Sequence, residues 1–192
     1  MSSINIQNKS IREYNLEMRL QENSQAIEFH VKDVFDKPIS LEKYKGRKVL
    51  LSFLRFTGCP VCNLHVYSLL QRKDEIDKKN LAIIFVFESE TETIKKYIKD
   101  ENLPFTFVSD PEQTLYNVYK VEKSWKKLIK WGLTFKGLSN GVKGYLKFNK
   151  YSSMKGSSDR VEAEFLIDEN GILEKVQYGE MVGDYMPISN YL

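Results

Sequence analysis

The sequence has few of the features that mark secreted or membrane-spanning proteins. Its 192 residues include two cysteines, two histidines, five prolines and ten glycines. Two cysteines are too few for a disulfide-stapled scaffold. No apolar run approaches the roughly 18 residues that a membrane span needs, and the N-terminal segment lacks the apolar core of a signal peptide. We therefore expect a cytoplasmic protein built around one globular domain.

Charge is distributed unevenly along the chain. The formal net charge is only +3. Residues 123–160 nevertheless contain ten of the 29 bases and one of the 26 acids, a net charge of +9, which leaves −6 for the remainder. The sequence thus predicts a mildly acidic domain that carries one strongly basic segment.

Apolar runs of strand length alternate with helical segments, which is typical of an α/β domain with a mixed sheet. The runs 48–56 and 81–87 are almost continuously apolar, as expected of strands buried on both faces. Asn170-Gly171 between two apolar runs indicates a closing hairpin. The predicted strands are 27–35, 48–56, 81–87, 105–108, 164–167 and 172–177, and the predicted helices are 60–79, 91–100 and 113–119.

The first 25 residues read as an N-terminal helical arm, which leaves residues 26–192 for the domain itself. Ser10 and Glu13 fit a capping box, in which each side chain satisfies a free helix N–H group. This predicts a short helix near residues 11–22.

The basic segment reads as a glycine-containing insertion over residues 122–160, placed before the closing hairpin. Apolar residues recur in it at near-helical spacing, as in an amphipathic helix: Trp125, Leu128, Ile129 and Leu133. We expect its apolar side to pack on the core and its lysines to face water. An anionic partner, such as a membrane surface, is the alternative, whereas no nucleic-acid-binding motif accompanies the charge.

Cys59-Pro60-Val61-Cys62 is the strongest functional signal. It follows a buried strand and begins a helix, since proline is favoured at the first helical position. Cys59 then occupies the cap, where free backbone N–H groups and the helix dipole lower a thiol pKa into the range of roughly 3.5–7.5. Cys62 lies one turn later, within reach of a disulfide. This pattern predicts redox chemistry at the two cysteines.

Metal binding is the alternative interpretation of the cysteine pair. A zinc site needs four ligands, and only His30 and His65 remain besides the pair, with no second pair of cysteines. The pair could instead hold a soft ion such as Cu(I) in a non-catalytic binding protein. We expect His65, on the same helix as the cysteines, to be a satisfied or half-exposed histidine with at most a minor role in tuning the thiols.

Several segments resemble, in the same order, the peroxiredoxin-like proteins of the AhpC/TSA group. The resemblance covers the opening at 27–53, the Cys-Pro-x-Cys segment at 53–63, the middle at 105–121 and the closing hairpin at 165–171. It implies a thioredoxin-like fold, a central mixed sheet flanked by helices, and thiol-dependent chemistry without a cofactor. The implied partners are a peroxide or disulfide substrate and a thiol electron donor, either thioredoxin-like or of low molecular weight.

The chain departs from that group at three positions. The group places Pro seven and Thr or Ser three residues before its peroxidatic cysteine, whereas Ser52 and Phe56 stand there before Cys59. Glu162 stands where the group tends to have Arg. Arg55 or Arg160 could replace that arginine beside a peroxide or a thiolate, but we favour the interpretation that both are surface charges.

The sequence as a whole predicts a thiol oxidoreductase in which Cys59 attacks and Cys62 resolves. The predicted positioning or activating residues are Thr57 and Pro60, together with Arg55 if it is not the surface charge considered above. The resemblance also allows the reverse order of the cysteines, and a homodimer is a further expectation. Whether the substrate is a peroxide or a disulfide stays open at this point.

Overall fold

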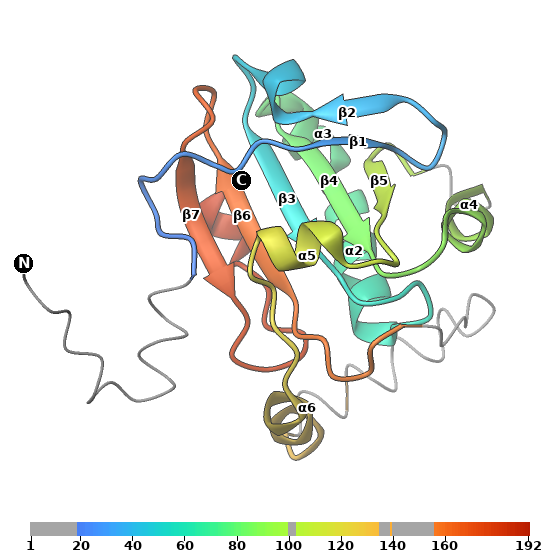
Figure 1. Ribbon diagram of the computed structural model, residues 1–192. Coiled ribbons are helices and arrows are strands. Elements are labelled where there is room, and N and C mark those ends of the chain that lie inside the picture. Colours follow the sequence, from blue (N-terminus) through green and yellow to red (C-terminus); the bar gives the residue numbers. More distant parts are fainter. Residues whose placement is uncertain (1–18, 100–102, 135–138, 140–155) are drawn as a thin grey trace, which may run out of the picture.

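A five-stranded mixed sheet forms the centre of the computed structural model, which describes residues 19–99, 103–134, 139 and 156–192 (Figure 1). The strand order is β5-β4-β3-β6-β7. Strands β3, β4 and β5 are parallel, whereas β6 and β7 are antiparallel to their neighbours. The strands are β3 (Val49–Phe53), β4 (Ala82–Phe87), β5 (Thr106–Ser109), β6 (Ala163–Ile167) and β7 (Leu173–Tyr178).

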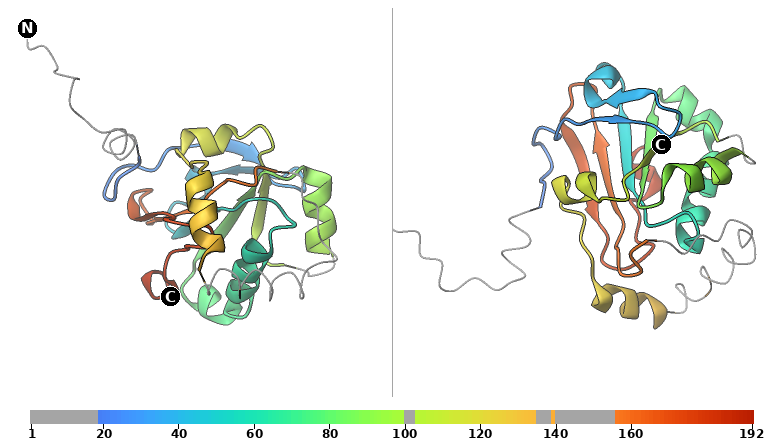
Figure 2. Two further views of the ribbon diagram at one scale, coloured as in Figure 1. Left: turned by 90° about the horizontal axis from the view of Figure 1, so that it is seen from below. Right: turned by 45° about the vertical axis from the view of Figure 1, so that its right-hand side comes forward.

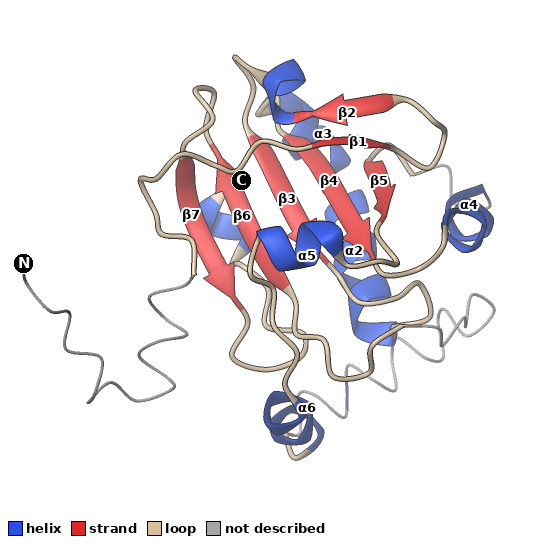
Figure 3. Cartoon of the chain, viewed as in Figure 1, coloured by secondary structure: helices blue, strands red, loops and turns tan. Residues whose placement is uncertain are grey.

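Helices cover both faces of this sheet (Figure 3). Helices α2 (Pro60–Leu70), α3 (Lys73–Lys78) and α4 (Thr91–Lys99) contribute to the core on one face, and α5 (Thr114–Val118) packs on the other. A separate hairpin of β1 (His30–Lys32) and β2 (Pro38–Ser40) precedes the sheet. Short 3-10 turns lie at η1 (Leu41–Tyr44) and η3 (Ile188–Asn190). The predicted fold class, a mixed sheet between layers of helices, is confirmed.

The central strands explain why their sequences are continuously apolar. Along β3, Leu50 faces the core under α2, whereas Leu51 and Phe53 face the core under α5. Every residue of β3 and β4 is buried. Alternate side chains of a strand point to opposite faces, so a strand covered on both sides needs apolar residues at consecutive positions.

Most predicted elements differ by a few residues at their ends, and three differ in ways that matter here. The predicted helix 60–79 is two helices, and the first turn of α3 carries Asp74 and Glu75, which stabilise a helix N-terminus. The predicted strand 27–35 shortens to β1 (His30–Lys32). Most of the predicted helix 11–22 lies outside the described residues, and its end, residues 19–22, is not helical.

Backbone hydrogen bonds connect the last residues of the arm, and the residue that follows them, to the closing hairpin. The N–H of Asn23 donates to the carbonyl of Leu173, and the N–H of Ala26 donates to that of Gly171. Gln25 forms an isolated bridge with Ile172. A domain boundary at residue 26 stays a prediction.

Helix α6 (Trp125–Gly132) confirms a helix in the basic segment, but its packing differs from the expectation. It lies beyond the end of the sheet, at the bottom of Figure 1 and of the right-hand view of Figure 2. Trp125 and Ile129 are 60% exposed and Leu133 is 83% exposed. The prediction that these three residues pack on the core is therefore wrong, although Trp131 packs partly against it. No helix in the described part of the chain is long and apolar enough to cross a bilayer.

Candidate active site

Cys59 is the N-cap residue of α2, as Pro60 led us to expect. Its backbone is extended (φ −70°, ψ 113°), and Pro60 opens the helix. The backbone N–H of Cys62 donates a hydrogen bond to the Cys59 sulfur at 3.4 Å. A thiolate at this position is stabilised by free N–H groups and by the positive end of the helix dipole.

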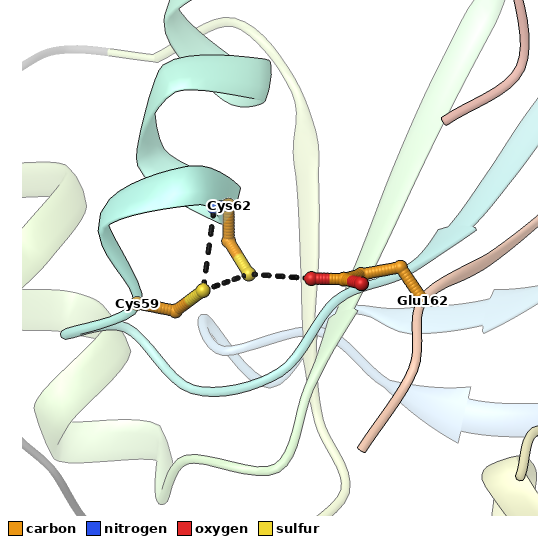
Figure 4. A group of neighbouring side chains, drawn as sticks. All are labelled: Cys59, Cys62 and Glu162. Atoms are coloured by element: carbon orange, nitrogen blue, oxygen red, sulfur yellow. Dashed lines mark hydrogen bonds between the residues drawn. The ribbon is translucent and has the colours of Figure 1, made fainter. Parts of the chain in front are cut away.

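The two cysteines lie side by side one turn apart, and the Glu162 carboxylate faces Cys62 (Figure 4). The Cys62 thiol donates to the Cys59 sulfur, with the two Sγ atoms 2.6 Å apart. Both residues are free cysteines and fully buried. The pair is therefore placed to form a disulfide with little change in the backbone.

The surroundings give the two thiols different acidities. Burial acts to raise the pKa of Cys59, but the hydrogen bond from Cys62 and the charge of Arg55 outweigh it and hold that pKa below its usual value. Burial, followed by the interaction with Cys59, raises the pKa of Cys62 well above its usual value. Of the two thiols, Cys59 therefore ionises first, and Cys62 keeps its proton to higher pH.

Arg55 supplies the positive charge of the site. Its Nη1 lies 3.8 Å from the Cys59 sulfur, and its Nη2 donates to the carbonyl of Ser158. The residue is only 6% exposed. The prediction of a surface charge is therefore wrong for Arg55, and the alternative, a guanidinium beside the thiolate, fits the geometry.

Arg160 is buried as well, but it serves a different purpose. Its Nε pairs with Glu88 Oε1 at 2.5 Å, and its other nitrogens donate to the Val121 carbonyl and to Gln113. Its guanidinium lies 4.5 Å from the ring centre of Tyr116. The surface interpretation of Arg160 is also wrong, and the contacts indicate a structural ion pair within the core.

Thr57 fixes the loop before α2 and does not contact the sulfurs through its hydroxyl. Its N–H donates to Ser89 Oγ at 3.0 Å, its hydroxyl lies 3.3 Å from the same oxygen, and its carbonyl accepts from Asn63 Nδ2. Phe56 has no hydroxyl to offer. The described residues thus provide Cys59 with a guanidinium and an N–H group as polar partners, together with the Cys62 thiol.

His65 is a satisfied core histidine, as predicted. Its Nε2 lies 2.7 Å from Glu164 Oε1, which also accepts from Ser52 Oγ at 2.8 Å. Its ring stacks on Tyr185 at 3.8 Å between centroids. The described contacts of His65 tie α2 to β6 and to the C-terminal segment and do not include either cysteine.

Glu162 is the residue of this site whose role sequence reasoning missed. It was notable only as a departure from the family pattern, where arginine is usual. Its Oε1 lies 3.6 Å from Cys62 Sγ, and its Oε2 accepts from the N–H of Gly183 at 3.0 Å. Burial raises the pKa of this carboxyl, and the charge of Arg55 only partly opposes that effect.

The three side chains drawn in Figure 4 also form a candidate metal site. One donor atom each from Cys59, Cys62 and Glu162 lies within 4.8 Å of the others. The Arg55 guanidinium, with Nη1 3.8 Å from the Cys59 sulfur, opposes a cation at this place. The arrangement suits a redox pair better than the Cu(I) site considered above.

A thioredoxin-like sheet with a cysteine pair at the first turn of the helix after β3 defines a thioredoxin-fold oxidoreductase. The model of the AhpC/TSA family matches residues 23–176, and the chain belongs to that family. Chloroplastic peroxiredoxin Q of Sedum lineare is 25% identical over 124 residues, which cover 65% of this chain and 63% of that protein. The chain therefore spans less than two thirds of this relative.

Solved structures show the same fold. The structure of peroxidoxin BcpB from Mycobacterium tuberculosis has a TM-score of 0.63 at 13% identity, covering 86% of this chain and 90% of that one. The structure of a yeast mitochondrial 1-Cys peroxiredoxin has a TM-score of 0.62 at 19% identity, covering 89% and 72%. Both likenesses support the thioredoxin-like fold deduced from the sheet.

Replacing Arg55 by Met is expected to slow alkylation of Cys59 by iodoacetamide about tenfold at pH 7. Thiolate forms as pH rises through the thiol pKa, so removing the nearby cation moves the rate profile to higher pH. Arg55→Lys keeps the charge and should retain most of the reactivity. Measurement of the alkylation rate from pH 4 to 10 checks this, in a Cys62→Ser background. An unchanged profile in Arg55→Met would show that Arg55 does not activate the sulfur.

Proposed function

We propose that this protein is a two-cysteine thiol peroxidase in which Cys59 is the nucleophile and Cys62 the resolving residue. The observation that carries this proposal is the geometry of the pair: the Cys59 sulfur caps α2 beside the Arg55 guanidinium, and the Cys62 thiol donates a hydrogen bond to it. The family supports it, since the relative named above is a peroxiredoxin by name.

The cycle uses the chain's own groups. The Cys59 thiolate attacks one peroxide oxygen, the O–O bond breaks, and the alkoxide or hydroxide that leaves takes up a proton. Cys59 is then a sulfenic acid, which condenses with the Cys62 thiol to give a disulfide and water. Two electrons from an external thiol restore the pair. The yeast 1-Cys peroxiredoxin has its thiol resolved via glutathione and thioredoxin systems, which makes such thiols the first donors to test.

Disulfide reduction is the second candidate, and the loop before α2 favours it. Phe56 replaces the hydroxyl residue of the family pattern, and the Thr57 hydroxyl is directed to Ser89. In this reaction Cys59 attacks a disulfide sulfur, one thiolate leaves, and Cys62 displaces the second thiolate from the mixed disulfide.

One experiment separates the two candidates. The reduced protein is mixed with one equivalent of hydrogen peroxide or of a small aromatic disulfide, and free thiols are followed in time. Loss of both thiols to peroxide within seconds supports the peroxidase. Free thiols that persist for many minutes with peroxide but react quickly with the disulfide support the reductase. Thiols that react with neither reagent contradict the proposed function altogether.

For the basic segment we propose an anionic lipid surface as the partner of α6. Trp125 and Ile129 lie four residues apart and therefore on one side of the helix, where both are exposed. Lys126 and Lys130 are exposed beside them. Exposed aromatic and aliphatic groups next to lysines are the features by which a helix binds an interface of anionic headgroups.

Vesicle binding tests this partner. Replacing Lys126 and Lys130 by Gln is expected to weaken binding to vesicles containing phosphatidylglycerol about thirtyfold, since each basic residue near such a surface contributes about 1 kcal/mol. Lys73→Gln with Lys78→Gln on α3 is the matched control and should change little. If the unmodified protein does not sediment with anionic vesicles at low salt, lipid is not the partner. Binding to an acidic protein instead would assign this surface to a protein partner.

A further inference from the structure

Resolution by Cys62 requires that this residue lose its proton, and its environment opposes that loss. The pKa of Cys62 lies well above its usual value because the thiol is buried and interacts with Cys59. In the reduced pair the Cys59 thiolate accepts the hydrogen bond from Cys62. Once Cys59 is oxidised to a sulfenic acid or a mixed disulfide, it is no longer a thiolate that can take that proton. A different base is then needed.

The Glu162 carboxylate is in the right place for such a base. It precedes β6 and is 1% exposed, with Oε1 3.6 Å from Cys62 Sγ. The N–H of Gly183 donates to Oε2 at 3.0 Å, and the Tyr185 hydroxyl donates to Oε1 at 3.4 Å. The carboxylate points at the Cys62 thiol (Figure 4), and these donors from the C-terminal segment hold it there. Among the described residues, it is the carboxylate in hydrogen-bond contact with Cys62.

We propose that Glu162 accepts the Cys62 proton when the disulfide closes. This inference rests on the proposed Cys59–Cys62 cycle. In the closing step the Cys62 sulfur bonds to the Cys59 sulfur, and the S–O bond of the sulfenic acid breaks. The proton passes from Cys62 to Glu162 and then to the departing hydroxide, which leaves as water. With a mixed disulfide, the departing group is a thiolate, and Glu162 ends protonated.

The groups around Glu162 suit this role near neutral pH. Cys62 faces it from α2 and Cys59 from the N-cap of that helix. Arg55 acts on it from the loop after β3, and Tyr185 contacts it from the C-terminal segment. Burial raises the pKa of the Glu162 carboxyl, and Arg55 opposes the rise. Burial also raises the pKa of Tyr185 well above its usual value, so the phenol stays a donor. A carboxyl with a raised pKa is a stronger base than an ordinary one, and general bases work best when their pKa approaches the working pH.

Replacing Glu162 by Gln tests the proposal by separating the two steps of a single turnover. The first step is followed as trapping of oxidised Cys59 by a sulfenic-acid reagent, or as release of the first thiolate from an aromatic disulfide. The second step is followed as loss of the Cys62 thiol. We expect the first rate to change less than threefold and the second to fall about 100-fold, the lower end of the effect of a positioned general base. In the unmodified protein the rate of disulfide closure should fall at low pH as Glu162 is protonated, and this fall should be absent in Glu162→Gln.

Glu164→Gln is the matched control, because Glu164 is a buried carboxylate two residues away that contacts His65 and Ser52 rather than a described sulfur. It should leave both rates and the pH profile of closure nearly unchanged. A Glu162→Gln variant that closes at the unmodified rate, with the same pH profile, overturns the proposal. If neither step occurs in the unmodified protein, the proposed function fails instead.

A second measurement avoids dependence on the variant's folding. The ¹³C resonance of the Glu162 side-chain carboxyl is followed against pH in the unmodified protein, in its dithiol and disulfide forms. We expect a titration above the usual range of glutamate that moves between the two redox forms. A midpoint that is the same in both forms overturns the proposal, because the carboxyl would then not sense the state of the thiols.

Discussion

A Cys59→Ser variant is expected to lose at least 1000-fold in its rate of reaction with peroxide or disulfide. The thiolate is the nucleophile in thiol redox chemistry, and a serine hydroxyl is not ionised at neutral pH. The remaining Cys62 is a poor substitute, because burial and the Cys59 side chain hold its proton in the intact pair. Stopped-flow measurement of thiol loss in the reduced variant checks this result.

Cys62→Ser is the matched variant, with a different expected outcome. It should carry out the first step at close to the unmodified rate and then stop, with Cys59 retained as a sulfenic acid or a mixed disulfide that mass spectrometry detects. The opposite pattern, a reactive Cys62 in Cys59→Ser and an inert Cys59 in Cys62→Ser, would reverse the assignment. That reversal is the alternative that the family resemblance had left open.

Replacing Arg160 by Met is expected to destabilise the fold by about 3–5 kcal/mol, because it leaves a buried carboxylate without its cation. The side chains of Arg160 and Glu88 are 2% and 1% exposed. Glu88 would keep one described hydrogen bond, from the N–H of Ser157 at 2.6 Å. Urea unfolding at neutral pH, followed by circular dichroism, measures the loss.

The exposed pair of Lys48 and Glu174 provides the comparison. Their side chains are 36% and 38% exposed. Lys48→Met should cost no more than about 1 kcal/mol, as is usual for a surface ion pair. Combining Arg160→Met with Glu88→Gln should recover part of the loss, since the buried charge is then gone. If Arg160→Met costs no more than Lys48→Met, the ion pair does not stabilise the core in the way its burial suggests.

Local patterns were sufficient to predict the sheet and the position of the cysteines. The apolar runs around β3 and β4 identified strands buried on both sides, and Pro60 marked the residue at which α2 begins. Each of these signals depends on neighbours within a few positions along the chain. Such signals predict structure reliably because strand alternation and the geometry of a helix start involve only consecutive residues.

The partners of the buried charges could not be predicted in the same way. Arg160 pairs with a residue 72 positions away, and Glu162 contacts Cys62 across 100 positions. A charged residue with a distant partner looks, in sequence, like one that faces water. For Trp125 and Ile129 the error was the reverse, because we predicted burial and the residues are exposed. An amphipathic pattern shows that a helix has an apolar side but not what lies against it.

The long separation between the two halves of the site has a consequence for biosynthesis. Cys59 and Cys62 leave the ribosome about 100 residues before Glu162 and about 120 before Tyr185. Until the closing hairpin is made and docks on β3, the cysteines lack the residues that bury them and hold the Cys62 proton. The unfinished chain therefore carries two accessible thiols, open to pairing with other chains in an oxidising compartment. Arg55 and the start of α2 are already present to lower the pKa of Cys59, but the burial that raises the pKa of Cys62 is complete only with the last strands of the sheet.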